Sequence, residues 1–108
     1  MEEFNQLVVT CYRLRLNFPS DERFRLTQQL HWSAVSVPAT IAEGKGKGTP
    51  NKFAHFLSIA SSSLTEGDTH VVIANELEYI TNEELGAVVE IVEEVARMIT
   101  GLRKTLSI

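Results

Sequence analysis

Residues 81–106, TNEELGAVVEIVEEVARMITGLRKTL, decide the fold class of this chain. Their apolar residues recur alternately three and four positions apart, which is the period of one helix face and not of a strand. Thr81 and Glu84 form a capping box at the start, because each side chain satisfies a backbone donor of the first turn. The stretch predicts one long helix with a heptad-spaced apolar face, formed by Leu85, Val88, Val92, Val95, Ile99, Leu102 and Leu106.

Three preceding segments have the same helical period and are separated by residues that end helices. Pro19 closes the first, because the residue before a proline is driven out of the helical region. Three glycines in 44–48 separate the second from the third, and Thr49 with Pro50 is a favourable N-cap and first helical residue. Ser20 offers an equivalent start to the second. The predicted helices are about 3–17, 21–43, 50–79 and 82–106.

Four amphipathic helices joined by short turns predict an all-α, antiparallel up-down-up-down four-helix bundle in one domain over 1–108. A length of 108 residues with 44% hydrophobic composition is ordinary for a single core. No apolar stretch is long enough to span a membrane, and the acidic start lacks the apolar segment of a secretory signal. Because Cys11 is the only cysteine, no internal disulfide can form, and we expect a cytoplasmic protein.

Several apolar residues lie off the predicted core faces. Ile91 and Met98 are seven residues apart on the fourth predicted helix, and Ile59 and Ile73 are fourteen apart on the third. A second apolar face in so small a bundle is typical of contact between subunits, which makes these residues candidates for a homo-oligomer interface. Trp32 is a candidate anchor for the same interface. The alternative, which the sequence leaves open, is a widened core face.

The formal net charge of −4 conceals a segregation of charge along the chain. Residues 13–52 hold seven basic and three acidic side chains, whereas 53–96 hold nine acidic and no basic ones. Residues 97–108 add three further basic side chains. Average acidity argues against a general nucleic-acid coat protein, and the segregation weakens that argument without reversing it.

The loop from Gly44 to Thr49 is the best candidate for an anion site. Its glycines expose backbone N–H groups, its lysines supply charge, and the following helix presents its positive end. Because the second predicted helix is roughly 35 Å long, basic residues at its two ends form one patch only if an oligomer gathers copies of each end. The alternative is a flexible turn in which Gly44 simply ends a helix. The candidate nucleic-acid or anion-binding residues are Arg23, Arg25, Lys45, Lys47 and Lys52.

No constellation of residues for catalysis or for metal binding is visible. The three histidines occur without the Glu-x-x-His pairs that carboxylate-bridged bundles need, so we expect no metal and no cofactor. Residues 61–63 are three serines that lack the G-x-S-x-G pattern of a nucleophile elbow. Cys11 lies on an apolar face, where a thiol is inert. We therefore expect a protein that is not an enzyme and takes no small-molecule substrate.

Residues 29–44, QLHWSAVSVPATIAEG, resemble the signature of the bacterial 23S ribosomal RNA intervening-sequence proteins, a family of four-helix bundles. The family includes the accessory variability proteins of diversity-generating retroelements. Those proteins look like homopentameric helical barrels, and they bind nucleic acid and associate with a reverse transcriptase. The resemblance therefore implies a non-enzymatic homopentamer, with RNA or DNA and a reverse transcriptase as partners. The signature residues, for which a structural role is expected, are Gln29, Ser36, Pro38, Ile41, Ala42, Glu43 and Gly44.

The chain departs from this family in ways that bear on function. The family's paired arginines after the glutamine are His31 and Trp32 here, and the leucine of a Glu-Leu-Glu-Thr run is Gly67. These losses, with the acidic second half of the chain, favour an alternative function. In that alternative the chain is a homo-oligomeric protein-interaction scaffold that binds no nucleic acid.

Overall fold

The computed structural model describes residues 2–22 and 25–106, and every regular element within them is helical. Four α-helices are joined by short turns, and two 3₁₀ turns lie between the first two helices. The all-α prediction is therefore confirmed for the described residues. The elements are α1 (Glu2–Leu14), η1 (Arg15–Asn17), η2 (Ser20–Glu22), α2 (Leu26–Lys45), α3 (Pro50–Glu76) and α4 (Asn82–Thr105).

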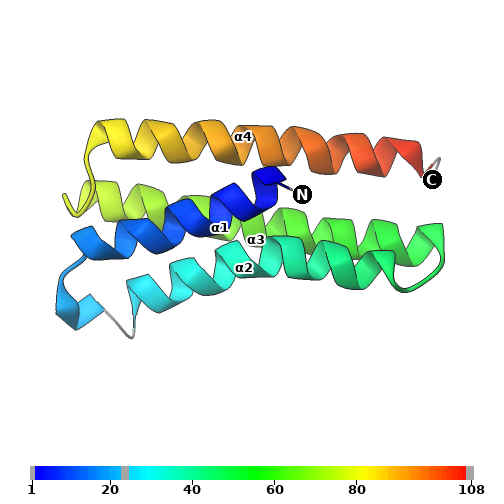
Figure 1. Ribbon diagram of the computed structural model, residues 1–108, viewed down its shortest axis with the longest axis horizontal. Coiled ribbons are helices and arrows are strands. Elements are labelled where there is room, and N and C mark those ends of the chain that lie inside the picture. Colours follow the sequence, from blue (N-terminus) through cyan, green and yellow to red (C-terminus); the bar gives the residue numbers. More distant parts are fainter. Residues whose placement is uncertain (1, 23–24, 107–108) are drawn as a thin grey trace.

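The helices lie side by side along the 44 Å long axis of the molecule, and successive helices run in opposite directions (Figure 1). Each helix packs against its neighbours in sequence, and α1 also packs against α4, so the contacts form a closed ring. α1 has 13 residues and α3 has 27, so α1 covers only about half of the bundle. The end of the molecule next to the α2–α3 loop is therefore built by α2, α3 and α4, without α1 (Figure 1).

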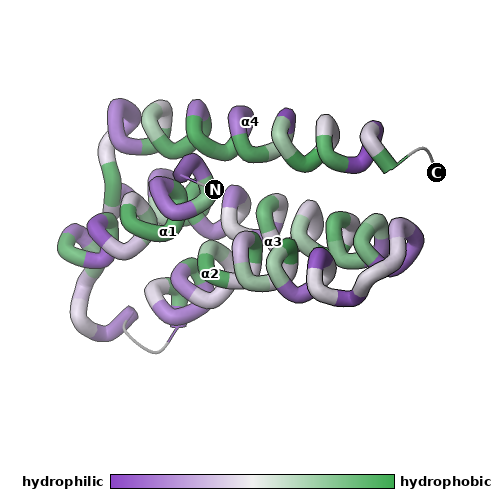
Figure 2. The backbone as a smooth tube through the Cα atoms, turned by 45° about the vertical axis from the view of Figure 1, so that its right-hand side comes forward, coloured by the Kyte–Doolittle hydropathy of each residue, from purple (hydrophilic) through white to green (hydrophobic). Residues whose placement is uncertain are grey.

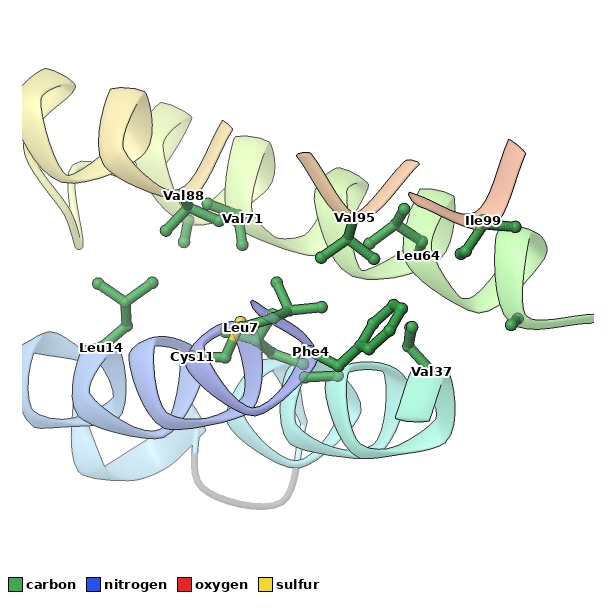
Figure 3. Close-up of a cluster of buried hydrophobic side chains, with 14 of the residues drawn as sticks. Phe4, Leu7, Cys11, Leu14, Val37, Leu64, Val71, Val88, Val95 and Ile99 are labelled. Atoms are coloured by element: carbon green, nitrogen blue, oxygen red, sulfur yellow. The ribbon is translucent and has the colours of Figure 1, made fainter. Parts of the chain in front are cut away.

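The core is formed by the inward faces of all four helices (Figure 3). Val88, Val95 and Ile99 of the predicted heptad face are buried, and its other four members are half-buried against the same core. Figure 2 shows the hydrophobic side of α4 turned toward the other helices. Burying one such side chain contributes about 1.5–3 kcal/mol, which makes this face the main source of stability for α4.

The side-chain caps predicted for two helices are present. The backbone N–H of Glu84 donates to Thr81 Oγ1 at 3.0 Å, and the backbone N–H of Thr81 donates to Glu84 Oε1 at 2.8 Å. The backbone N–H of Lys52 donates to Thr49 Oγ1 at 3.3 Å, and Pro50 occupies the first turn. The predicted starts of α3 and α4 are thereby confirmed.

The predicted start of the second helix, at residue 21, is wrong. Ser20–Glu22 forms the 3₁₀ turn η2, and α2 begins at Leu26 after Arg25, whose φ of −122° and ψ of −101° are not helical. The physical reason is a tertiary contact, because Tyr79 Oη donates to Glu22 Oε2 at 2.7 Å. This bond holds η2 against the chain that follows α3.

Three predicted helix ends also differ from the structure. α1 ends at Leu14 and not at residue 17, because Arg15–Asn17 winds more tightly as the 3₁₀ turn η1. α3 ends at Glu76 and not at residue 79, because Glu78 adopts a left-handed φ of 64° that a helix cannot continue. α2 runs through Pro38 to Lys45 and is capped by Gly46, so Gly44 lies inside the helix and does not end it. A Cβ at Gly44 would overlap the Cβ of Phe56, so this glycine permits a close approach of α2 and α3.

None of the helices formed by residues 2–22 and 25–106 has the length and apolar character needed to cross a membrane.

Candidate nucleic-acid interface

Five basic side chains from three helices and a loop lie at one end of the molecule, where the α2–α3 loop meets the C-terminal end of α4 (Figure 1). All five are exposed. We call this surface the cationic end. It consists of Lys45 at the end of α2, Lys47 in the loop, Lys52 in the first turn of α3, and Arg103 and Lys104 in the last turn of α4.

A hydrogen bond joins the two sides of the cationic end. Arg103 Nη2 donates to Ser58 Oγ at 2.9 Å, which ties the last turn of α4 to the first half of α3. Arg103 and Lys104 were not among the candidate anion-binding residues identified from the sequence. The signal that could have found them is topological, because an antiparallel bundle brings the C-terminal end of the fourth helix beside the loop after the second.

Lys47 is held loosely at the centre of this surface. Its Nζ lies 5.6 Å from the centre of the Phe56 ring and 4.0 Å from Glu43 Oε2. Exposed ion pairs of this kind contribute only about 0–1 kcal/mol, so the lysine remains available to a stronger anionic partner. The contact also pairs the signature residue Glu43 with a basic side chain.

The backbone of the Gly44–Thr49 loop is less available to an anion than the sequence indicated. The N–H of Gly46 bonds to the carbonyls of Ala42 and Glu43 at 3.2 Å each, and the N–H of Lys47 bonds to the carbonyl of Gly44 at 3.1 Å. These donors are therefore used within the chain. What the loop presents outward is the charge of its lysine side chains.

The remaining candidate anion-binding residues do not join the cationic end. Arg25 is exposed at the N-cap of α2, and Arg23 lies outside the described residues. α2 has 20 residues, so about 30 Å separates Arg25 from Lys45 at 1.5 Å per residue. A single chain thus presents the lysines and Arg25 on two separate surfaces.

Several signature residues hold α2 against α3. Ser36 Oγ lies 3.0 Å from Ser63 Oγ and 3.4 Å from Thr40 Oγ1, and Ile41 is buried in the core. Gly44 allows the close approach described above. The other signature residues lie elsewhere on α2: Pro38 is half-buried, and Gln29, Ala42 and Glu43 are exposed.

The candidate interface residues fall into two groups. Ile91 and Met98 are half-buried and pack against the core, as the widened-face alternative describes. Ile59 and Ile73 are each 39% exposed on α3, and Trp32 is 75% exposed on α2. Of the candidate interface residues, those that lack a complete packing partner within the described chain are therefore on α2 and α3.

A groove of about 960 Å³ lies along the exposed side of α2, beside the end of α1. Its walls include Tyr12 and Arg15 from the α1–η1 segment, and His31 and Trp32 from α2. The Tyr12 and His31 rings lie 4.0 Å apart, centre to centre, at a tilt of 43°. Burial lowers the pKa of His31 from 6.5, the charge of Arg15 lowers it further, and a backbone hydrogen bond to Cys11 partly opposes both. The sequence did not predict this groove, because α1 supplies one of its walls.

In the described part of the chain, no three His, Cys, Asp or Glu side chains are grouped so that they could hold a metal ion. Cys11 is buried, and burial raises the pKa of its thiol to about 12. A thiol with so high a pKa has almost no thiolate at neutral pH and is a poor nucleophile.

A solved structure shares the fold of this chain. The chain is similar to a crystal structure of a protein with unknown function from the S23 ribosomal protein family of Bacteroides thetaiotaomicron VPI-5482, with 21% sequence identity and a TM-score of 0.83. The match covers 95% of this chain and 96% of that one. No curated protein sequence matches the chain. The family model of the 23S rRNA-intervening sequence protein matches residues 1–101, and the chain therefore belongs to that family.

Proposed function

We propose that this protein is a non-enzymatic, homo-oligomeric adaptor that binds the phosphates of RNA or DNA through its cationic end. The observation that carries the proposal is the gathering of five exposed basic side chains from α2, the α2–α3 loop, α3 and α4 on one surface. Phosphate contacts supply most of the sequence-independent affinity for nucleic acid, and they need only accessible charge. A local cationic surface can therefore bind nucleic acid although the whole chain has a formal charge of −4.

The test is retardation of a labelled RNA and a labelled DNA at a series of salt concentrations. Each phosphate that a basic side chain neutralises adds about 0.7 (single strand) to 0.9 (duplex) to the slope of log affinity against log salt. Changing Lys45, Lys47 and Lys52 to Gln is expected to lower this slope, and adding Arg103→Gln and Lys104→Gln is expected to lower it again. Absence of binding even at low ionic strength would refute the proposal.

The matched control is Arg97→Gln. Arg97 is also an exposed basic residue of α4, but its Nη2 already donates to Glu94 Oε2 at 2.8 Å. We expect the slope of this variant to equal that of the unchanged protein. An equal loss in the control and in the lysine variants would mean that binding follows overall charge and not the cationic end.

The oligomer is proposed to form through the apolar residues that α3 exposes. Ile59, Val72 and Ile73 of α3 and Leu77 at its C-cap are 37–49% exposed, and an apolar stripe of this kind on a small bundle is typical of a subunit contact. The family resemblance makes a pentameric barrel the expected assembly. Light scattering is expected to give about five times the chain mass of 12.1 kDa, and Ile59→Lys with Ile73→Lys is expected to reduce it.

The second candidate function is a protein-interaction scaffold that binds no nucleic acid. It is favoured by the nine acidic and no basic residues of 53–96, which make α3 beyond its first turn and most of α4 unsuitable for phosphates. The two functions are distinguished by pulling down a reverse transcriptase, or another defined partner, before and after nuclease treatment. Capture that survives nuclease, together with no salt-sensitive retardation, would establish the scaffold.

A further inference from the structure

The most exposed aromatic side chain of the described chain lies in the α2 groove. Trp32 is 75% exposed, although tryptophan is mostly buried in folded proteins. Leaving so large an apolar surface in water is unfavourable, so an exposed tryptophan inside a groove indicates a binding surface. The groove, at about 960 Å³, is large enough for a planar ring beside the indole.

The rest of the groove combines aromatic walls with positive charge. The Tyr12 ring packs on the His31 ring at 4.0 Å, so these two side chains form a fixed wall. Arg15 lines the same end of the groove, and its Nη1 donates to the carbonyl of Tyr12 at 3.1 Å, which holds the guanidinium beside the aromatic pair. Arg25, at the N-cap of α2, is exposed at this same end of the helix.

The lining of the groove has its positive and negative charges at different ends. Of the acidic residues, only Glu43 lines the groove among the described residues, and it lies at the opposite end from Arg15. Asp21 and Glu22 belong to turn η2, a few residues before Arg25, where they offset the charge of Arg25; neither lines the groove. An anionic chain would therefore approach from the Arg15 end.

We propose that the α2 groove binds unpaired bases of single-stranded nucleic acid, with Trp32 as the stacking surface and Arg15 as the contact for an adjacent phosphate. Exposed aromatic rings beside basic side chains are how proteins hold single strands, because every unpaired base has a free face to stack. A duplex hides those faces. The inference rests on the proposed function and adds the substrate class, which is unpaired and not duplex nucleic acid.

The chain carries its own probe for this site, because Trp32 is its only tryptophan. A base stacked on the indole quenches its fluorescence, so we would titrate the protein at low salt with a 12-residue oligothymidylate. The matched ligands are an abasic strand with the same phosphates and a closed hairpin duplex. Quenching by oligothymidylate, with little or none from the abasic strand and the hairpin, is the expected result.

Affinity of the variants is measured by the anisotropy of a labelled oligothymidylate. Trp32→Ala is expected to weaken binding about tenfold, and Trp32→Phe is expected to recover part of the loss because a ring is restored. Val9→Ala is the control, since Val9 is an exposed apolar residue (46%) on α1, outside the groove and outside the proposed subunit contact. Circular dichroism checks that each variant is folded.

The other outcomes overturn the inference in separable ways. Equal quenching by the abasic strand, or unchanged affinity of Trp32→Ala, would leave phosphate binding at the cationic end intact and remove the stacking site. A fall in oligomer mass of Trp32→Ala with unchanged affinity for the strand would make Trp32 a protein contact. No binding of any strand at low salt would refute the proposed function together with this inference.

Discussion

Gly44 of α2 and Phe56 of α3 approach so closely that a Cβ on the glycine would overlap the Cβ of the phenylalanine. Gly44 directly precedes Lys45, the last residue of α2, and Lys47 follows in the α2–α3 loop. The contact therefore sets how the lysines are placed, and the glycine of the family signature has a packing role here.

Gly44→Ala is expected to destabilise the fold by about 1–3 kcal/mol, because overpacking forces the backbones of α2 and α3 apart. Gly86→Ala is the control. Gly86 lies in α4 with no atom within 4 Å of an added Cβ, so alanine there is expected to stabilise by about 0.5–1 kcal/mol. Urea unfolding followed by circular dichroism measures both, and equal effects would contradict the close-approach argument.

Thr81→Ala is expected to cost about 1 kcal/mol, because it leaves the backbone N–H of Glu84 without its acceptor at the start of α4. Thr100→Ala, an exposed threonine near the other end of the same helix, is expected to change the free energy of unfolding by much less. The comparison uses the same urea titration. A loss at Thr100 as large as that at Thr81 would mean that the cap contributes nothing specific.

The pKa of His31 is lowered by burial, so the folded state favours the neutral ring and the unfolded chain binds the proton more tightly. Stability is therefore expected to fall as the pH drops below about 6.5, the ordinary pKa of histidine. The Nε2 atom is buried without a hydrogen-bond partner, so a proton added there would have no acceptor. Thermal unfolding between pH 7.5 and 5.5 measures the effect.

His31→Gln is expected to flatten this pH dependence, whereas His55→Gln, at an exposed position on α3, is expected to leave it unchanged. An undiminished pH dependence in His31→Gln would assign the effect to other groups.

Cys11 is expected to resist thiol reagents at pH 8 in the folded protein, because burial raises its pKa to about 12 and excludes the reagent. Labelling with a chromogenic disulfide should become complete in urea. Val9→Cys provides the positive control, since Val9 is 46% exposed on the same helix. Rapid labelling of the native protein at Cys11 would contradict its placement in the core.

Local signals in the sequence were sufficient for most of the fold. The heptad spacing of residues 85–106 and the caps at Thr49 and Thr81 depend on neighbours within a few positions, and the structure has the helices that they predict. The start of α2 was predicted wrongly because Ser20 and its acidic neighbours have the pattern of an N-cap. In the structure this segment is the 3₁₀ turn η2, and Glu22 accepts a hydrogen bond from Tyr79. A contact between residues 57 positions apart cannot be predicted from a local sequence pattern.

Only part of the candidate site could be predicted from the sequence, because the rest depends on contacts between distant residues. Lys45, Lys47 and Lys52 are close together in the sequence, whereas Arg103 reaches them only through the antiparallel arrangement of α4 and α3. The groove depends on α1 lying beside α2, and the exposure of Trp32 could not be inferred from its position next to an apolar face. The composition of the cationic end and the exposure of Trp32 in the groove both depend on which segments are neighbours in the folded chain, and residue types alone do not reveal this.

The short length of α1 gives the two halves of the bundle different local stability. The first half of α4 packs against both α1 and α3. Its last turns extend past α1, so they pack against α3 and are joined to it by the Arg103–Ser58 hydrogen bond. Amide hydrogens there should exchange with solvent sooner than those near Val88, through openings that cost less than global unfolding. A polyanion bound across the last turn of α4 and the α2–α3 loop would slow that exchange, so that ligand binding and local ordering of α4 would be coupled at the same surface.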